Sequence, residues 1–381
     1  MLLKQMIKKF TEMSRKMKGF ISIVLLTFIG SIIFVHNNYS FYERPIVEVV
    51  KTELLNQAEI KDHVNNKDKL FTQQIIGEVK NGEEKGKQIY LTNEFTSSKA
   101  NNDEYHIGSE LFVHIDSEVG ENGYLKGSVD DVKRDKYLLM ITWVFIFSLL
   151  FVGKRQGLFS LFSLVINAII LSIALDVYVN TSEKSLLIIC SISVIIFTII
   201  SLILVSGRNE KTYAAIIATL LGTFLSLAIT YFVLWVTSEK GLRYEELQFI
   251  TRPYKLVFLA GLFLGSLGAV MDVAITMSSS IIGLYEKNNN ISVKALITSG
   301  REIGKDIMGT MTNILLFAYI SGTIPMLILY FKNASPLGFT LSMNLSLELA
   351  RALAGGIGIV LTIPIGLYIT IFFVNRKRAS E

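Results

Sequence analysis

Residues 256–285 read LVFLAGLFLGSLGAVMDVAITMSSSIIGLY. This apolar run exceeds the roughly 20 residues that a helix needs to cross a bilayer, so it predicts a transmembrane helix. One ionisable residue, Asp272, lies within the run. Because a charged side chain in the bilayer core costs about 2.5–3.5 kcal/mol on insertion scales, Asp272 is the first candidate functional residue.

One helical face of this run combines glycines with polar side chains. At a spacing of three or four residues, the face carries Gly261, Gly265, Gly268, Asp272, Thr276, Ser279 and Gly283. Its glycine half predicts close packing against another helix. The opposite face is apolar and suits lipid or packing. We therefore expect Asp272 to face protein and not lipid.

The composition is typical of an integral membrane protein. Of 381 residues, 51% are hydrophobic and only 18% are charged. The net charge is +5, and the basic residues lie between apolar runs, which predicts no nucleic-acid partner. No P-loop, HExxH or Cys-x-x-Cys motif occurs in the sequence. We therefore expect neither an enzyme nor a cofactor or metal site.

Apolar runs predict eight transmembrane helices in an all-α membrane bundle. The predicted spans are 19–35, 137–153, 158–178, 185–206, 213–236, 256–285, 306–331 and 347–374. Residues 1–42 join a basic leader to the first span, which predicts an uncleaved signal anchor. Residues 135–381 hold the other seven spans. Basic residues concentrate in alternate loops, so both termini are predicted to be cytoplasmic.

Residues 43–134 differ from the rest of the chain in being polar. Short strand-like runs are separated by turn signals such as Asn81-Gly82. This pattern predicts a small β-barrel or sandwich, inserted after the first span and outside the cytoplasm by topology.

Residues 291–305 predict an amphipathic helix on the cytoplasmic leaflet. Apolar residues fall on one face, and Lys294, Arg301 and Lys305 lie opposite, where they can reach lipid headgroups. An ordinary amphipathic connector explains the same pattern.

The next predicted span, 306–331, also carries polar residues on one helical face. Asp306, Gly309, Thr310 and Asn313 share one face. Gly309 predicts helix packing, and Asn313 is expected at a depth similar to that of Asp272, where it could donate to the carboxyl. Asp272 is then protonated, faces a water-filled crevice, or holds a cation with nearby hydroxyls. The structural alternative is that protonated Asp272 only ties two helices together through Asn313 and Thr312.

A second charged pair lies at the start of the last span. Glu348 and Arg351 are three residues apart, a spacing that predicts a local ion pair. The alternative is that Arg351 binds an anion.

Two stretches resemble a known family. They are GAVMDVAITMSSSI (268–281) and SGREIGKDIMGTMTNILLFAYISG (299–322). Both are similar to the signature of the YibE/F family of bacterial multi-spanning membrane proteins, and the anchor with its outside domain resembles a YibE-type member. This resemblance implies the bacterial cytoplasmic membrane and a shorter YibF-type partner. A homo-oligomer is the other assembly expected.

A weaker resemblance, to the SecD/SecF and resistance-nodulation-division transporters, implies a proton-relay role for Asp272 and the segment 306–313 by analogy.

The sequence thus predicts a membrane transporter or transport-associated subunit, coupled to protons through Asp272. Its relay candidates are Asp272, Thr276, Ser279, Asp306, Thr310 and Asn313. The alternative is a non-transporting membrane scaffold whose outside domain binds partners. An intramembrane enzyme is disfavoured, because Asp272 lacks a second acid at clearly matching depth.

Overall fold

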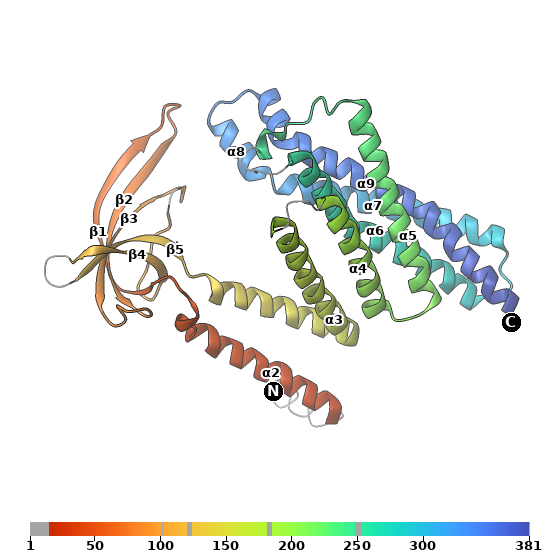
Figure 1. The fold of residues 1–381 in the computed structure, drawn as a ribbon, viewed down its shortest axis with the longest axis horizontal. Coiled ribbons are helices and arrows are strands. Elements are labelled where there is room, and N and C mark those ends of the chain that lie inside the picture. Colours follow the sequence, from red (N-terminus) through yellow and green to blue (C-terminus); the bar gives the residue numbers. More distant parts are fainter. Residues whose placement is uncertain (1–14, 101, 120–123, 181–184, 248–252, 381) are drawn as a thin grey trace, which may run out of the picture. The chain divides into compact units, whose positions relative to one another are not determined.

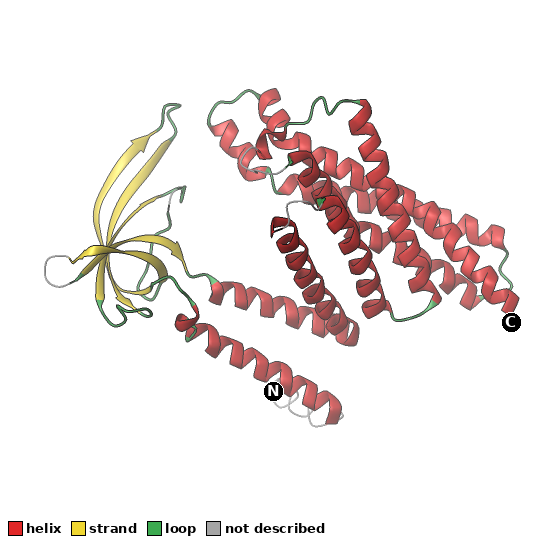
Figure 2. Ribbon diagram, viewed as in Figure 1, coloured by secondary structure: helices red, strands yellow, loops and turns green. Residues whose placement is uncertain are grey.

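The computed structural model describes residues 15–100, 102–119, 124–180, 185–247 and 253–380 (Figures 1 and 2). Most of the predicted basic leader, residues 1–14, lies outside this range. The chain divides into two compact units, Met1–Ser148 and Leu149–Glu381. Helices dominate, and a single small sheet precedes most of them in sequence.

The sheet is a closed barrel with the strand order β1-β2-β3-β5-β4. Its strands are β1 (Ile46–Lys61), β2 (Lys67–Val79), β3 (Gln88–Thr96), β4 (Glu110–Val119) and β5 (Leu125–Val132). Only β3 and β5 pair in parallel; the other pairs are antiparallel. Alternate side chains point inward and form one core, which includes Val47, Val49, Ile75, Ile89, Leu91, Leu111 and Val113. The predicted small β domain is therefore a barrel.

Helices α2 (Arg15–His36) and α3 (Asp135–Asn180) flank the barrel in sequence. The beginning of α3 contacts α2, where the Trp143 Nε1 atom donates to the Ser31 hydroxyl at 2.8 Å and the Trp143 ring meets Phe28 edge-on. Within α3, Lys154 has non-helical backbone angles (φ 47°, ψ −120°). This interruption falls between the spans predicted at 137–153 and 158–178.

The second unit is a helical bundle. Besides the second part of α3 it contains α4 (Leu186–Ser206), α5 (Glu210–Val236), η3 (Tyr244–Leu247), α6 (Tyr254–Lys287), α7 (Val293–Ser321), α8 (Ile324–Lys332) and α9 (Leu337–Ser380). Helix α6 is central, and its buried side chains include Val270, Val273, Met277 and Ile281, which pack with residues of α7 and α9. The apolar face of the 256–285 run is therefore a packing face.

Six described helices are long and apolar enough to cross a membrane, and the bent pair α7–α8 makes a seventh. The bend between α7 and α8 is 48°. One of the six is α3, which is 46 residues long and is divided at Lys154. These helices make the chain a multi-pass membrane protein by length and composition.

The region predicted as an interfacial helix, 291–305, is not a separate element. Helix α7 begins at Val293 and runs without a break to Ser321. Leu296, Gly300 and Gly304 are buried. A Cβ atom at Gly304 would collide with Ile363 of α9, so the lack of a side chain there allows α7 to approach α9 closely. Residues 293–305 are therefore the first part of α7 and pack against the bundle.

Candidate functional site

The polar face of α6 is exposed on the bundle. Asp272 and Thr276 are exposed and Ser279 is half-buried, whereas Val273 and Met277 are fully buried on the opposite side. Within the described residues, the Asp272 carboxyl has no hydrogen-bond or ion-pair partner. The described helices therefore leave Asp272 uncovered.

Helix α7 presents a second polar face. Asp306, Thr310 and Asn313 are exposed, while Leu315 is buried. The Thr310 hydroxyl donates to the Ile307 carbonyl of its own helix at 2.9 Å. Helical periodicity places these exposed residues, like Asp272 and Thr276, on sides of their helices that face away from α9. We call Asp272, Thr276, Asp306, Thr310 and Asn313 together the polar surface.

Contacts between α6 and α7 show which residues of the two helices lie at the same level along the helix axes. A Cβ at Gly300 would lie 2.8 Å from the Ile281 side chain, and Leu315 and Ser266 meet at the same glycine of α9, Gly355. Since α6 and α7 are antiparallel, interpolation between these contacts puts Gly309 level with Asp272. Asn313 then lies about 6 Å, or one turn, further along.

Two predicted contacts of Asp272 are therefore not found in the described part of the chain. No hydrogen bond joins Asn313 to Asp272. Thr312 cannot tie Asp272 to α7 either, because it faces α9: its methyl group would lie 3.4 Å from a Cβ at Gly356, and its hydroxyl donates to the Met308 carbonyl at 2.7 Å.

The glycines predicted to pack against another helix have different roles. A Cβ at Gly268 or Gly309 would meet nothing within 4 Å. Gly265 instead leaves space for the Tyr319 hydroxyl, and the Arg351 Nε atom lies 3.9 Å from a Cβ built at Gly261. Side chains of neighbouring helices pack directly onto the backbone of other glycines, at Gly222, Gly300, Gly304 and Gly355.

This difference gives a prediction for the packing of α7. Gly304→Val is expected to lower the stability of the bundle by about 1–3 kcal/mol, because the added side chain collides with Ile363. The matched control is Gly309→Val on the same helix, with an expected change within about 0.5 kcal/mol in the isolated chain. Thermal unfolding of the two variants in detergent measures the difference, and equal midpoints would contradict the packing described.

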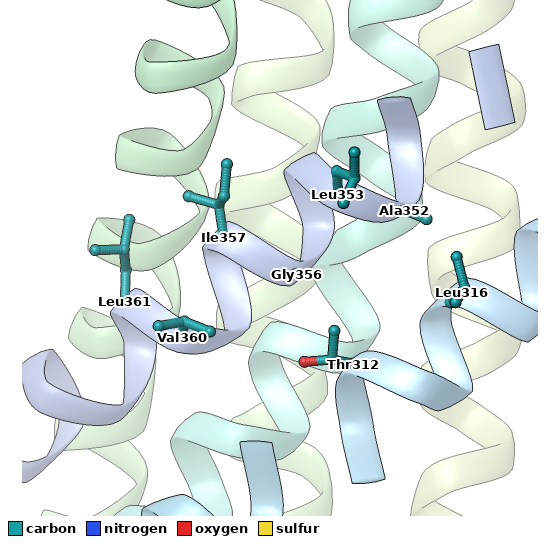
Figure 3. A pocket seen from close by; sticks show the side chains of 8 residues that line it. All are labelled: Thr312, Leu316, Ala352, Leu353, Gly356, Ile357, Val360 and Leu361. Carbon is teal, nitrogen blue, oxygen red and sulfur yellow. The ribbon is translucent and has the colours of Figure 1, made fainter. Parts of the chain in front are cut away.

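An apolar pocket of 370 Å³ lies between α7 and α9 (Figure 3). Its lining residues are Thr312, Leu316, Ala352, Leu353, Gly356, Ile357, Val360 and Leu361. Because the only hydroxyl in this lining is already bonded within its own helix, the pocket offers no polar chemistry. The polar surface is the better candidate site.

The first unit contains a buried charge cluster that the sequence analysis missed. Lys133 is 1% exposed, and its Nζ atom lies 3.0 Å from both Glu110 and Asp135 and 3.1 Å from the Val35 carbonyl. Tyr39 donates to Glu110 at 2.9 Å and Tyr42 donates to Asp135 at 3.0 Å. These residues join the end of α2, the barrel and the start of α3. We call Lys133, Glu110 and Asp135 the junction cluster.

Charge in the junction cluster is stabilised by hydrogen bonds. Burial opposes the charge on Lys133, but hydrogen bonds to Glu110 and Asp135 outweigh it and hold the pKa of Lys133 above its ordinary value. Lys133 is therefore charged at neutral pH. Burial, together with the hydrogen bond to Glu110, raises the pKa of the Tyr39 hydroxyl, so Tyr39 remains a donor.

The architecture is that of a multi-pass membrane protein with a small β-barrel domain near its N-terminus. Comparison of the sequence with family models agrees with this class. The model for YibE/F-like protein matches residues 141–376, and the model for the YibE/F family N-terminal domain matches residues 40–132. The chain belongs to the YibE/F family. No curated protein and no solved structure matches it.

Proposed function

We propose that the protein spans the bacterial cytoplasmic membrane eight times, with both termini in the cytoplasm and the barrel outside. The count treats the two parts of α3, before and after Lys154, as separate spans and the bent pair α7–α8 as one. Basic residues Lys154 and Arg155 at the α3 interruption then lie on the cytoplasmic side, as the positive-inside rule requires.

We further propose that the protein is a transporter or a transport-associated subunit, coupled to protons through Asp272. The supporting observation is that Asp272 is exposed on α6, a helix long and apolar enough to cross a membrane. Its carboxyl has no partner among the described residues. Acids in transmembrane segments almost always face a protein interior or an aqueous cavity, and they mark ion and proton pathways. Asp272 would be the proton-carrying group of the polar surface.

The other members of the site have supporting roles in this proposal. Thr276, Ser279 and Asn313 orient the carboxyl or water next to it, Thr310 extends the polar lining, and Asp306 lies at the cytoplasmic mouth. Because the polar surface would otherwise meet lipid, another membrane subunit covers it in the working assembly. A shorter YibF-type protein or a second copy of this chain would supply that cover.

Proton flux into liposomes that contain a pH-sensitive dye tests the function. The full chain is reconstituted alone and with any membrane protein that co-purifies with it. Proton flux that depends on the protein supports transport. A folded protein that gives no flux in either preparation, while a known proton carrier does, rejects it.

A second candidate function is a membrane scaffold whose barrel binds partners outside the cytoplasm. One observation favours it. Beyond Val49, one edge of β1 has no strand partner among the described residues, and Leu54 and Leu55 are 51% and 55% exposed on this segment. Open strand edges bind extended peptides by strand addition. A peptide complex at β1 combined with absence of flux would favour the scaffold.

A further inference from the structure

A partly open cavity that contains a charged pair lies within the helical unit, between α6, the end of α7 and α9. Its volume is 460 Å³. The lining residues are Gly261, Ala318, Tyr319, Gly322, Thr323, Glu348 and Arg351. A cavity with a charged pair among helices of this composition needs an explanation beyond packing.

The ion pair in this cavity leaves most of the arginine uncommitted. The Arg351 Nη1 atom donates to Glu348, which confirms the predicted pair, and the guanidinium lies 5.3 Å from the centre of the Phe258 ring. The Nε atom is buried and has no hydrogen-bond partner. Of the five N–H donors of a guanidinium, those on its Nε edge are therefore unused by the described residues.

A second unused donor belongs to another residue that lines the cavity. The Tyr319 hydroxyl is buried, has no hydrogen-bond partner among the described residues, and fits over Gly265. A Cβ at Gly261, one turn earlier on α6, would lie 3.9 Å from the Arg351 Nε atom, an ordinary contact. Since buried polar groups nearly always have partners, two unpartnered donors in one cavity indicate that an acceptor belongs there.

The break between α7 and α8 brings the C-terminal end of α7 and the N-terminal end of α8, where Pro325 lacks an N–H, to the same cavity. Thr323, which lines the cavity, is the N-cap residue of α8, and no side chain caps that helix start. The free N–H groups at a helix N-terminus carry a partial positive charge and favour anions. Interrupted helices are a recurring feature of binding sites in membrane transporters.

We propose that this cavity binds a small oxoanion, a phosphate or carboxylate group, through the Nε edge of Arg351 and the Tyr319 hydroxyl, while Glu348 stays on the Nη1 atom of Arg351. The planar guanidinium holds two oxygens of such a group in parallel, and the tyrosine hydroxyl donates to a third position. The identification of this cavity as the substrate site of the transporter rests on the proposed function. Binding of an oxoanion to the cavity can be measured independently of proton flux.

Titration of inorganic phosphate and acetate into the full-length protein tests the site. The protein is held in a maltoside detergent, which contains no phosphate. Arg351→Lys is expected to weaken binding about tenfold or more, because the lysine loses the fork geometry. Tyr319→Phe is expected to weaken binding several-fold, and Glu348→Gln is expected to strengthen it, because a negative charge that repels the anion is removed. Arg243→Lys is the matched control, since Arg243 also pairs with a nearby glutamate, Glu245, but is exposed.

The oxoanion could come from solution or from a lipid headgroup. Mass spectrometry of the detergent-purified protein separates these sources. Retained phospholipid that Arg351→Lys loses and Arg243→Lys keeps would assign the site to a lipid phosphate. Binding of free phosphate or acetate that follows the variants would assign it to a soluble anion. If neither ligand is bound, or if binding is equal in wild type and Arg351→Lys with both folded, the proposal is overturned, whatever the proton flux.

Discussion

Lys133→Met is expected to lower the free energy of unfolding of the N-terminal unit by about 3–5 kcal/mol, the typical cost of removing one partner from a buried ion pair. The ammonium group is 1% exposed and lies 3.0 Å from two carboxylates, Glu110 and Asp135. Methionine fills much of the volume but removes the ammonium group that bridges the two carboxylates, and it leaves Glu110 with the more distant Lys136, whose Nζ atom lies 3.9 Å away. Most of the loss therefore comes from electrostatics and not from packing.

Denaturant unfolding of the full chain in detergent measures this effect. Trp143 reports on the junction of α2 and α3, and a Trp235→Phe background removes the other tryptophan. The matched control is Lys80→Met. Lys80 also contacts two carboxylates, Glu48 at 2.8 Å and Glu78 at 3.3 Å, but its side chain is 23% exposed. Its loss is expected to cost about 1 kcal/mol or less.

A second substitution checks the cause. Glu110→Gln added to Lys133→Met is expected to restore part of the lost stability, because one uncompensated carboxylate is removed. If Lys133→Met and Lys80→Met shift the unfolding midpoint equally, burial does not make the junction cluster more important for stability than a more exposed ion pair.

Periodicity alone predicted the class of the fold. Strict alternation in segments such as Leu111–Val113–Ile115 indicated strands, and long apolar runs indicated membrane helices. The strand order of the barrel depends on non-local pairing, as in the parallel contact of β3 with β5. Local sequence does not encode that pairing, so barrel and sandwich could not be separated beforehand.

The junction cluster shows a different limit. Glu110, Lys133 and Asp135 are ordinary charged residues in a polar domain, and no motif sets them apart. Their importance arises from burial, which only the folded chain provides. The same reasoning applies to Tyr319, which lies in an apolar span and whose hydroxyl is placed against Gly265 only by the fold.

The orientation of α6 was only partly predictable. Helical periodicity identified the face that contains Asp272, and we expected that face to meet protein. The structure shows that the opposite face supplies the helix's packing contacts, because α6 lies between α5, α7 and α9 and buries Val270, Val273 and Met277 there. The sequence pattern of a central helix distinguishes its two faces, but it does not show which face other helices of the same chain will pack against.

Asp272→Asn is expected to reduce proton flux in liposomes about 100-fold or more, while the protein folds and assembles as wild type does. Asparagine has nearly the shape of aspartate and keeps the hydrogen-bonding oxygen, but it cannot take up and release a proton at neutral pH. Asp176→Asn is the matched control. Asp176 is also an exposed acid in a long apolar helix, but it accepts a hydrogen bond from Asn180 at 2.9 Å and is expected to leave the flux unchanged.

Asp272→Leu separates proton carriage from a purely structural role. If the carboxyl only joins α6 to a covering subunit, asparagine preserves that contact and leucine breaks it, so the leucine variant alone loses its partner during purification. If Asp272 carries protons, both variants lose flux, and the asparagine variant does so with its assembly intact. Flux in Asp272→Asn equal to wild type would exclude the coupling role, and the exposed carboxyl would then be a contact for another subunit.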